Sequence, residues 1–409
     1  MLRVVHTADW HLGHTLYDYD RSAEHQRFLD WLVLELEQRA VDVLLIAGDV
    51  FETANPPVSA LRQWYSFLAK ATERCPTLEI VAIGGNHDSA ARLDAPESLL
   101  SERVHVIGGL PRRNGRELDM ERMVLPLHNA QGACEAWVAA IPYLRVSDLP
   151  RVGKAGEQSL TDGVHQLHQQ VFERLFQKAQ AGHAALAMGH LYMQNAALSP
   201  DSERKVLGGN QNPLCQELFP ERLAYVALGH LHYAQAVGRE SIRYSGSPIP
   251  LSMTERGYMH QIVVLQVQDG ALKRLDHVPI PRSVQMIRLP DDGYLPLVPL
   301  LKRIAELPDR DLAATDLPYL ELRVSLPSAE PTLRSQVEDA LESKAVRLLA
   351  VRTEYTGGGK ALADHSEALD LLQPEQVFCR AWQRAFEAPI PEEVLAGFHE
   401  LIELAEQDK

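Results

Sequence analysis

Five apolar, β-branched segments of this chain end abruptly in polar side chains. The segments are Leu2–Thr7, Val41–Ala47, Ile80–Ile83, Ala184–Met188 and Tyr225–Leu228. Short apolar runs of this kind, bounded by glycine and polar residues, predict buried β-strands. Each predicted strand therefore ends where carboxylate, amide or imidazole groups begin.

Longer stretches between these segments carry apolar residues at helical spacing, as at Phe28, Leu32 and Leu36. Helices are predicted over Ser22–Arg39, Val58–Arg74, Ser89–Leu100 and Leu160–Ala181. This alternation of strands and helices predicts a layered α/β domain. In such sheets the functional residues gather at the carboxyl ends of the strands.

The predicted domain organisation changes at the prolines Pro279 and Pro281. Residues 1–280 are predicted to form the main domain. Residues 281–355, with alternating strand and helix patterns, are predicted to form a small α+β domain. Residues 356–366 contain three consecutive glycines and are typical of a flexible linker. Residues 367–409 are predicted to be helical.

Composition and charge narrow the class of protein. The 409 residues are 45% hydrophobic and 23% charged, as in ordinary globular proteins. The chain has no run of about 18 apolar residues and no signal-peptide pattern, so no membrane segment is expected. The four cysteines are scattered, which argues against a disulfide framework and fits a reducing cytoplasm. The net charge of −15 argues against a nucleic-acid partner, although bound cations would cancel part of it.

The polar groups that end the strands are hard metal ligands. They are Asp9, His11, Asp49, Asn86, His190, His230 and His232. Because the set contains no thiolate, it suits Mn²⁺, Fe²⁺ or Zn²⁺. Two cations about 3.5–4 Å apart need a bridging carboxylate, and Asp49 stands alone at its strand end as the candidate bridge.

Two neighbouring residues and several cations complete the candidate site. His87 directly follows Asn86 and is the candidate to protonate a leaving alkoxide or to donate to phosphoryl oxygens. Asp88 is expected to hold the His87 tautomer. His14 lies close enough in sequence to touch a substrate. The arginines expected near the motifs are Arg21, Arg62, Arg92, Arg112 and Arg113, of which Arg92 is the chosen substrate contact.

These motifs resemble a known superfamily. Asp9-x-His11, Gly48-Asp49, Gly85-Asn86-His87-Asp88, Gly189-His190 and Gly229-His230-x-His232 resemble the five motifs of the calcineurin-like metallophosphoesterases. The longer strings HTADWHLGHTLY, AGDVFETANPP, GGNHDS, ALGHLH and YSGSPIPLS are similar to the SbcD family of bacterial nucleases, which act with an SMC-like ATPase.

The resemblance implies a specific architecture and ligand set. The fold would be a layered β-sandwich flanked by helices, with 281–355 as a capping domain and 367–409 as helices that dock on the ATPase. One cation would be held by Asp9, His11, Asp49 and His232. The other would be held by Asp49, Asn86, His190 and His230. His87 would be the catalytic histidine.

The resemblance also implies an activity and partners. The activity would be Mn²⁺-dependent DNA cleavage, as a 3′–5′ exonuclease on duplex ends and an endonuclease on single strands and hairpins. This activity would serve DNA end processing, repair and recombination. The chain would form a homodimer and a heterotetramer of two nuclease and two ATPase chains, in the cytoplasm.

Two other function classes use the same core. A small-molecule or protein phosphoesterase is favoured by the acidic net charge, and disfavoured by the extra domain and the C-terminal segment. A non-catalytic scaffold would need a broken ligand set, whereas the set here is intact.

Overall fold

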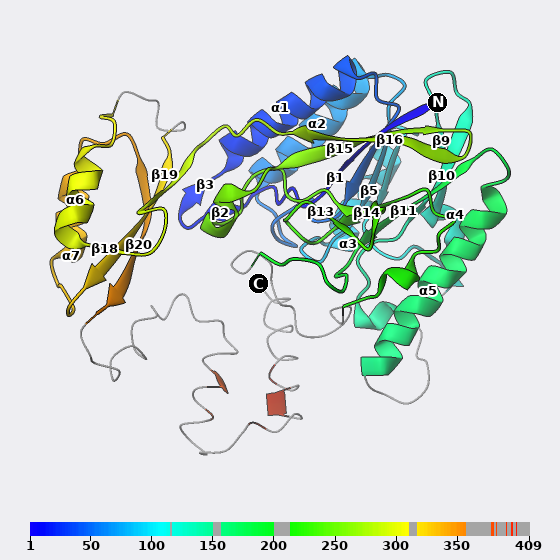
Figure 1. Ribbon diagram of the computed structural model, residues 1–409. Coiled ribbons are helices and arrows are strands. Elements are labelled where there is room, and N and C mark those ends of the chain that lie inside the picture. The colour runs from blue at the N-terminus through cyan, green and yellow to red at the C-terminus, as the bar shows by residue number, and fades with distance from the viewer. Residues whose placement is uncertain are drawn as a thin grey trace.

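The computed structural model describes residues 1–114, 117–149, 157–199, 213–310 and 317–356, with a few isolated positions beyond residue 377. The expected C-terminal helices at 367–409, and nearly all of the expected linker at 356–366, lie outside the described residues. Within the described part, two six-stranded sheets build a larger unit and a four-stranded sheet builds a smaller one (Figure 1).

The first sheet of the larger unit has the strand order β16-β15-β1-β4-β5-β6. Its strands are β1 (Leu2–Thr7), β4 (Val43–Ala47), β5 (Glu79–Ile83), β6 (Val104–Ile107), β15 (Gln261–Gln268) and β16 (Ala271–Pro279). Strands β1, β4, β5 and β6 run parallel to one another, and β15 runs antiparallel to both β1 and β16. The carboxyl ends of β1, β4 and β5 therefore lie side by side.

The second sheet has the strand order β13-β14-β12-β11-β10-β9. Its strands are β9 (Val124–His128), β10 (Cys134–Ala140), β11 (Ala184–His190), β12 (Tyr225–Gly229), β13 (Gln235–Val237) and β14 (Arg239–Tyr244). Strands β10, β11, β12 and β14 run parallel. The ends of β11 and β12 are thus neighbours, like those of β1, β4 and β5.

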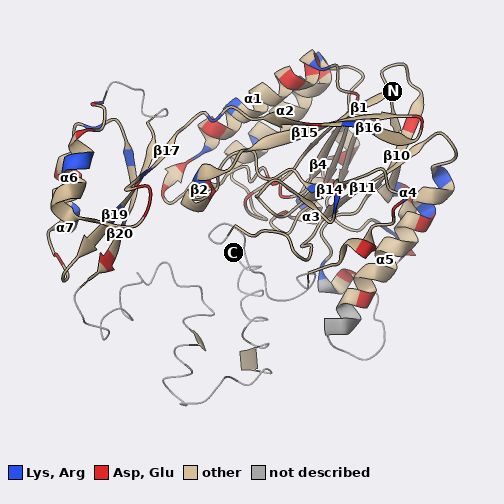
Figure 2. Cartoon of the chain, viewed as in Figure 1, with Lys and Arg blue, Asp and Glu red and all other residues tan. Residues whose placement is uncertain are grey.

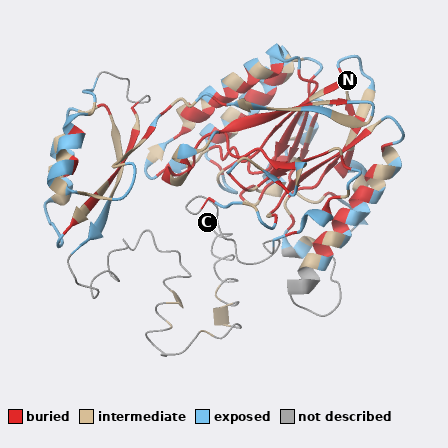
Figure 3. Cartoon of the chain, in the orientation of Figure 1, coloured by how far each residue is buried: buried red, intermediate tan, exposed pale blue. Residues whose placement is uncertain are grey.

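Side-chain alternation along the strands produces the layers. Val43 and Leu45 of β4 belong to the apolar cluster between the two sheets, whereas Leu44 and Ile46 belong to the cluster that contains the helices. A strand buried on both faces needs apolar residues at every position, which explains the continuous runs in the sequence. Figure 3 shows the central strands as almost wholly buried. The predicted layered sandwich flanked by helices is confirmed.

Helices cover the outer faces of the two sheets. α1 (Ser22–Gln38) and α2 (Val58–Arg74) cover the first sheet, and α5 (Glu157–Lys178) covers the second. The helix predicted over Ser89–Leu100 is wrong, since α3 (Ala90–Asp94) ends early and a 3-10 turn, Glu97–Leu99, follows. Pro96 separates the two pieces, because proline has no N–H to continue a helix.

Charged side chains lie mainly on the outward faces of the helices (Figure 2). Within the described residues, none of the helices is both long and apolar enough to cross a membrane. The shorter elements of the larger unit are β2 (Thr15–Leu16), β3 (Tyr19–Asp20), β7 (Arg112–Arg113), β8 (Glu117–Leu118) and α4 (Met120–Met123).

The smaller unit follows the β16 strand in the sequence. It contains β17 (Met286–Leu289), β18 (Leu295–Pro296), α6 (Leu297–Ala305), β19 (Tyr319–Leu326), α7 (Leu333–Leu341) and β20 (Arg347–Tyr355). The other three strands all run parallel to β19. The smaller unit contacts the larger one through a cluster that includes Leu16, Met253 and Tyr319. The Tyr319 hydroxyl donates to Glu24 of α1 at 2.8 Å.

Candidate metal centre

Loops from five strand ends meet at one place. The segments after β1 and β4 stay paired beyond the sheet, because Asp9 N–H donates to the Gly48 carbonyl at 3.0 Å and His11 N–H donates to the Asp49 carbonyl at 3.0 Å. From the opposite sheet, His230 N–H donates to Asp9 Oδ1 at 2.8 Å. The two sheets therefore bring the predicted ligands together.

The backbone at this place is strained. Asp9, His11, Asp49 and His230 are non-glycine residues with φ values of 55°, 48°, 49° and 104°. Left-handed conformations of this kind destabilise a folded chain by roughly 1–3 kcal/mol each and persist where the surroundings enforce them. Four such residues lie where the five loops meet. Their strained backbone indicates a functional site at which the direction of each side chain is fixed at a cost in stability.

Two glycines allow this close approach. Gly48 has φ of 93°, and a Cβ there would lie 2.2 Å from His190 Nδ1. A Cβ on Gly85 would lie 2.1 Å from Asp49 Oδ1. Any side chain at either position would displace a candidate ligand. By contrast, a Cβ on Gly189 would meet nothing closer than 3.3 Å, so this glycine is not required by packing at the site.

His190, Asp49 and Asn86 present acceptor atoms to one another. His190 Nδ1 donates to the Ala47 carbonyl at 2.9 Å, which leaves Nε2 without a proton in the neutral ring. That Nε2 lies 3.3 Å from Asp49 Oδ2 and 3.0 Å from Asn86 Oδ1. Nδ1 of His230 lies 3.0 Å from the same Asn86 oxygen. When the His190 ring is neutral these atoms are all acceptors, so a cation must lie among them, either a proton on Nε2 or a metal ion.

His11 and His232 are oriented by buried or half-buried carboxylates. His11 Nδ1 lies 2.9 Å from Glu52 Oε2, and His232 Nδ1 lies 2.9 Å from Glu255 Oε1. Carboxylates that accept from one imidazole nitrogen are typical of metal-ligating histidines, because they fix the tautomer and turn the other nitrogen toward the ion. Asp49 Oδ2 lies 3.7 Å from His11 Nε2, so this carboxylate stands between His11 and His190.

Buried atoms without hydrogen-bond partners test the fit to a metal. Asp9 Oδ2 and His11 Nε2 are both buried and have none. Ligand atoms of Asp9, His11 and His232 lie within 4.8 Å of one another, and so do those of Asp9, Asp49 and His190. These are oxygen and imidazole ligand atoms, and the histidines are held in place by hydrogen bonds at their other ring nitrogen. Such a set fits divalent cations from Mn²⁺ to Zn²⁺.

The electrostatics of the cluster point the same way. Burial raises the pKa of Asp9 to about 7. Burial opposes a charge on His190 as well, yet the nearby Asp49 carboxylate outweighs it and raises the pKa of His190 to about 9. The same proximity to His190 holds the pKa of Asp49 well below its usual range despite burial. Without a metal ion, protons on His190 and on Asp9 therefore balance the negative charge of the cluster.

His87 is placed beside Asp49. Its backbone N–H donates to Asp49 Oδ1 at 2.9 Å, and its Nδ1 lies 2.7 Å from the Glu52 carbonyl oxygen. Its ring meets that of His11 edge-on, with centroids 4.8 Å apart. Asp88 does not hold the His87 tautomer as expected. Its carboxylate instead accepts from the backbone N–H groups of Val50, Phe51 and Gly85, at 2.9–3.1 Å, and so joins the β4 and β5 loops.

The expected substrate contacts lie in different environments. His14 follows the β1 loop and is half-buried, and burial lowers its pKa to about 3. Arg92 is exposed on α3. Arg21, expected only to lie near the motifs, is fully buried, pairs with Glu24 and donates to the Pro250 carbonyl, so it is not available to a substrate.

Two glutamates of the site were not predicted. Glu52 contributes its carboxylate to His11 and its carbonyl to His87. Burial opposes its charge, but the hydrogen bond to His11 outweighs burial and lowers the pKa of Glu52 to about 2. Glu255 is fully buried. Glu52 lies three residues after Asp49, which was a usable signal, whereas Glu255 had no recognisable one.

Comparison with known proteins identifies two matching family models. The model described as calcineurin-like phosphoesterase matches residues 2–234, more than half of the chain. The model described as Type 5 capsule protein repressor C-terminal domain matches residues 282–386. The first match spans all five strand-end motifs, and the second begins between β16 and β17.

Curated relatives match along nearly the whole chain. The SbcD subunit of the nuclease SbcCD from Rhodobacter capsulatus is 38% identical over 387 residues, which cover 93% of this chain and 94% of the relative. The SbcD subunit from Escherichia coli K12 is 30% identical over 396 residues, covering 93% and 92%. A third, from Bacillus subtilis, is 33% identical over 274 residues, covering 66% and 67%.

Proposed function

The chain belongs to the SbcD family of nuclease subunits, within the calcineurin-like phosphoesterases, and from that premise we propose that it cleaves DNA at a two-cation centre. The proposed reactions are 3′–5′ exonuclease cleavage of duplex ends and endonuclease cleavage of single strands and hairpins. The observation that carries the proposal is the convergence of acceptor atoms from Asp49, Asn86 and His190.

The proposed ligand sets divide the cluster at Asp49. Asp9, His11, Asp49 and His232 hold one cation, and Asp49, Asn86, His190 and His230 hold the other. The placement of Asp49 Oδ2 between His11 Nε2 and His190 Nε2 supports its role as the bridge. We propose Mn²⁺ as the ion. When bound, such a pair of ions supplies Lewis acidity to a phosphoryl oxygen and lowers the pKa of the attacking water.

His87 is the proposed proton donor to the leaving alkoxide. Its Nδ1 is engaged by the Glu52 carbonyl, so Nε2 is the nitrogen that exchanges a proton with the substrate. The backbone bond from His87 N–H to Asp49 fixes the histidine relative to the bridging carboxylate. Asp88 supports this arrangement by tying the β4 and β5 loops together. His14 and Arg92 remain the proposed substrate contacts.

The proposed partner is an SMC-like ATPase. Residues 367–409 would dock on its coiled coil, in a heterotetramer of two nuclease and two ATPase chains built on a nuclease homodimer. Deletion of the residues after 365 is expected to abolish ATPase binding and to leave Mn²⁺-dependent cleavage intact. Co-purification with the ATPase tests this, and binding that survives the deletion would disprove the docking assignment.

The activity is tested with purified full-length protein and Mn²⁺ on end-labelled duplex DNA. His87→Ala is expected to remove cleavage, whereas His165→Ala, at a half-buried position on α5 away from the metal centre, is the matched control and should cleave normally. No cleavage by the wild type, or equal cleavage by His87→Ala, would contradict the proposal.

A second substrate separates the alternative. Bis-p-nitrophenyl phosphate enters a two-cation site without needing a DNA surface. Hydrolysis of this ester by a protein that leaves DNA intact would favour a small-molecule phosphoesterase, the function that the net charge of −15 favours.

A further inference from the structure

A cleft with a cavity volume of about 430 Å³ lies where the larger unit leads into the smaller one. Its apolar walls include Ile249, Pro250, Met259 and Ile280. In the described part of the chain, none of the seven candidate metal ligands lines this cleft. It is therefore a separate feature from the metal centre.

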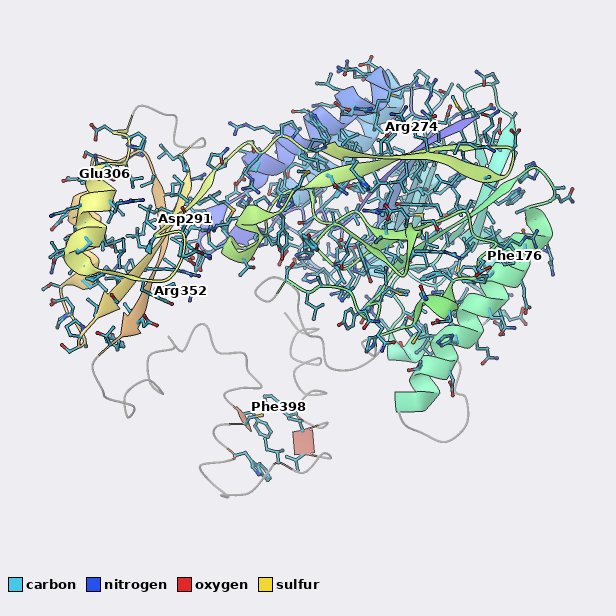
Figure 4. The ribbon with its side chains drawn as sticks, in the orientation of Figure 1. Phe176, Arg274, Asp291, Glu306, Arg352 and Phe398 are labelled. Atoms are coloured by element: carbon cyan, nitrogen blue, oxygen red, sulfur yellow. The ribbon has the colours of Figure 1, made fainter. Side chains whose placement is uncertain are left out.

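The charged side chains that line the cleft are engaged within the protein. Glu24 pairs with Arg21 and accepts from the Tyr319 hydroxyl. Arg256 pairs with Asp291 at 3.2 Å, and Asp291, labelled in Figure 4, belongs to the smaller unit. Arg282 donates to the carbonyls of Arg256 and Tyr258 at 2.6 and 3.1 Å. Glu24 and Arg256 are thus each paired with an opposite charge, whereas Arg282 keeps its positive charge, because backbone carbonyls do not neutralise a guanidinium.

His260 supplies the polar group that is not engaged. It lines the cleft and is 7% exposed. Its Nδ1 donates to the Ser247 carbonyl at 2.7 Å, and its Nε2 is buried without a hydrogen-bond partner. Burial lowers the pKa of His260, so the ring is neutral and Nε2 is an acceptor. A buried acceptor without a donor destabilises the protein, and a ligand that donates to it would relieve this.

We propose that this cleft binds a mainly apolar small molecule whose N–H or O–H group donates to Nε2 of His260. Ligand sites in proteins are mostly apolar, hold a few oriented polar groups and have volumes of roughly 300–1,000 Å³. The cleft meets each of these conditions, with apolar walls and one buried acceptor. One or two aromatic rings with a single donor would match it in size and chemistry.

A row of close contacts connects His260 to the metal centre. The Ser247 hydroxyl lies 3.4 Å from His260 Nδ1 and 3.4 Å from Glu255 Oε2. The other oxygen of Glu255 lies 2.9 Å from His232 Nδ1, and Leu251 N–H donates to Oε2 at 2.8 Å. A ligand that moves His260 therefore changes the surroundings of the carboxylate that orients His232. This coupling rests on the proposed metal centre, whereas ligand binding itself does not.

Ligand-observed NMR on the full-length, metal-free protein tests the binding. The probes are neutral one- and two-ring aromatic N–H and O–H donors, including phenol, indole and 7-azaindole. Met259→Trp fills the cleft from its rim, where Met259 is 68% exposed, and should weaken every genuine hit at least tenfold. Val298→Trp, at a 65% exposed position on α6, is the matched control and should bind normally.

His260→Phe keeps the ring and removes the acceptor, and it should weaken the same hits at least fivefold. No binding by the wild type, or equal binding by Met259→Trp, would overturn the proposal. If His260→Phe does not fold, Met259→Trp still tests the proposal, because Met259 lies at the surface and its substitution should not affect folding.

The coupling is measured as the Kd for Mn²⁺ with and without a saturating hit. We expect a change of at least threefold, and thermodynamic reciprocity requires Mn²⁺ to change the affinity for the hit by the same factor. An unchanged Kd would overturn the coupling alone. Failure to bind Mn²⁺ in either condition would instead count against the metal centre and the proposed function.

Discussion

Two clusters built around a buried carboxylate in this protein differ in how their charge is balanced. At the strand ends of the larger unit, Asp49 Oδ2 and Asn86 Oδ1 face Nε2 of His190, which is an acceptor too unless it carries a proton. In the smaller unit, Glu321 is 3% exposed and has Arg288 and Arg323 at 2.6 and 3.2 Å. The Glu321 cluster is complete within the chain, whereas the strand-end cluster relies on protons for its positive charge. A buried network that requires an external cation is thus distinguishable from one that only joins strands.

Asp49→Asn should produce the largest effect, because it removes the carboxylate that both proposed ligand sets share. Nuclease activity is expected to fall at least roughly 10³-fold, equivalent to about 4 kcal/mol of lost transition-state stabilisation. Single-turnover cleavage of duplex DNA with Mn²⁺ measures it. Activity within tenfold of the wild type would remove Asp49 from its bridging role.

Glu321→Gln should act on stability and spare chemistry. Removing this charge leaves Arg288, at a 2.6 Å contact, without its buried partner, and stability is expected to fall by about 3 kcal/mol. Urea unfolding measures the loss. Glu338→Gln, which breaks a surface pair with Arg334, is the control and should leave the unfolding midpoint unchanged. If folded Glu321→Gln protein lost its nuclease activity, the claim that the Glu321 cluster contributes only to stability would be contradicted.

Saturating Mn²⁺ should stabilise the wild type and Glu321→Gln equally. A ligand at 100 times its Kd adds about 2.7 kcal/mol to the free energy of unfolding. The increment should shrink in Asp49→Asn, where the bridge is lost. Thermal unfolding with and without Mn²⁺ gives the comparison, and equal increments in all three proteins would place the ions elsewhere.

Glu255→Gln should have a smaller effect, since it keeps the shape of the side chain and removes only its charge. Groups that orient a metal ligand are worth about 10–100-fold in affinity, and we expect about tenfold weaker Mn²⁺ binding here. Calorimetric titration measures it. An unchanged Kd would show that the 2.9 Å contact to His232 Nδ1 does not tune the centre.

Local patterns explain why much of the fold was predictable. Strands such as β1 and helices such as α1 and α2 matched their predicted bounds almost to the residue, because their periodicity is set by burial on one or two faces. Within each sheet the motifs could be assigned to one edge, since parallel strands end together, whereas the grouping of both edges into one site came from the resemblance to a known superfamily.

Contacts between distant segments explain what was missed. Glu255 lies 23 residues from His232, and Ala47 contributes only a backbone carbonyl to His190, so neither partner has a local signature. Asp88 was assigned to His87 by adjacency, although its oxygens are taken by backbone N–H groups from two loops. The His260 cleft is lined by segments far apart in the sequence, from Glu24 to Gln285, which no local pattern encodes.

Anomalous diffraction from crystals grown with Mn²⁺ tests the central claim most directly. The proposed two-cation centre requires one ion on either side of Asp49, about 3.5–4 Å apart, and none at Glu321. Two such peaks, contacted by His11 and His232 on one side and by His190 and Asn86 on the other, are the expected result. A single peak, or none within reach of Asp49 at saturating Mn²⁺, would contradict a two-cation centre.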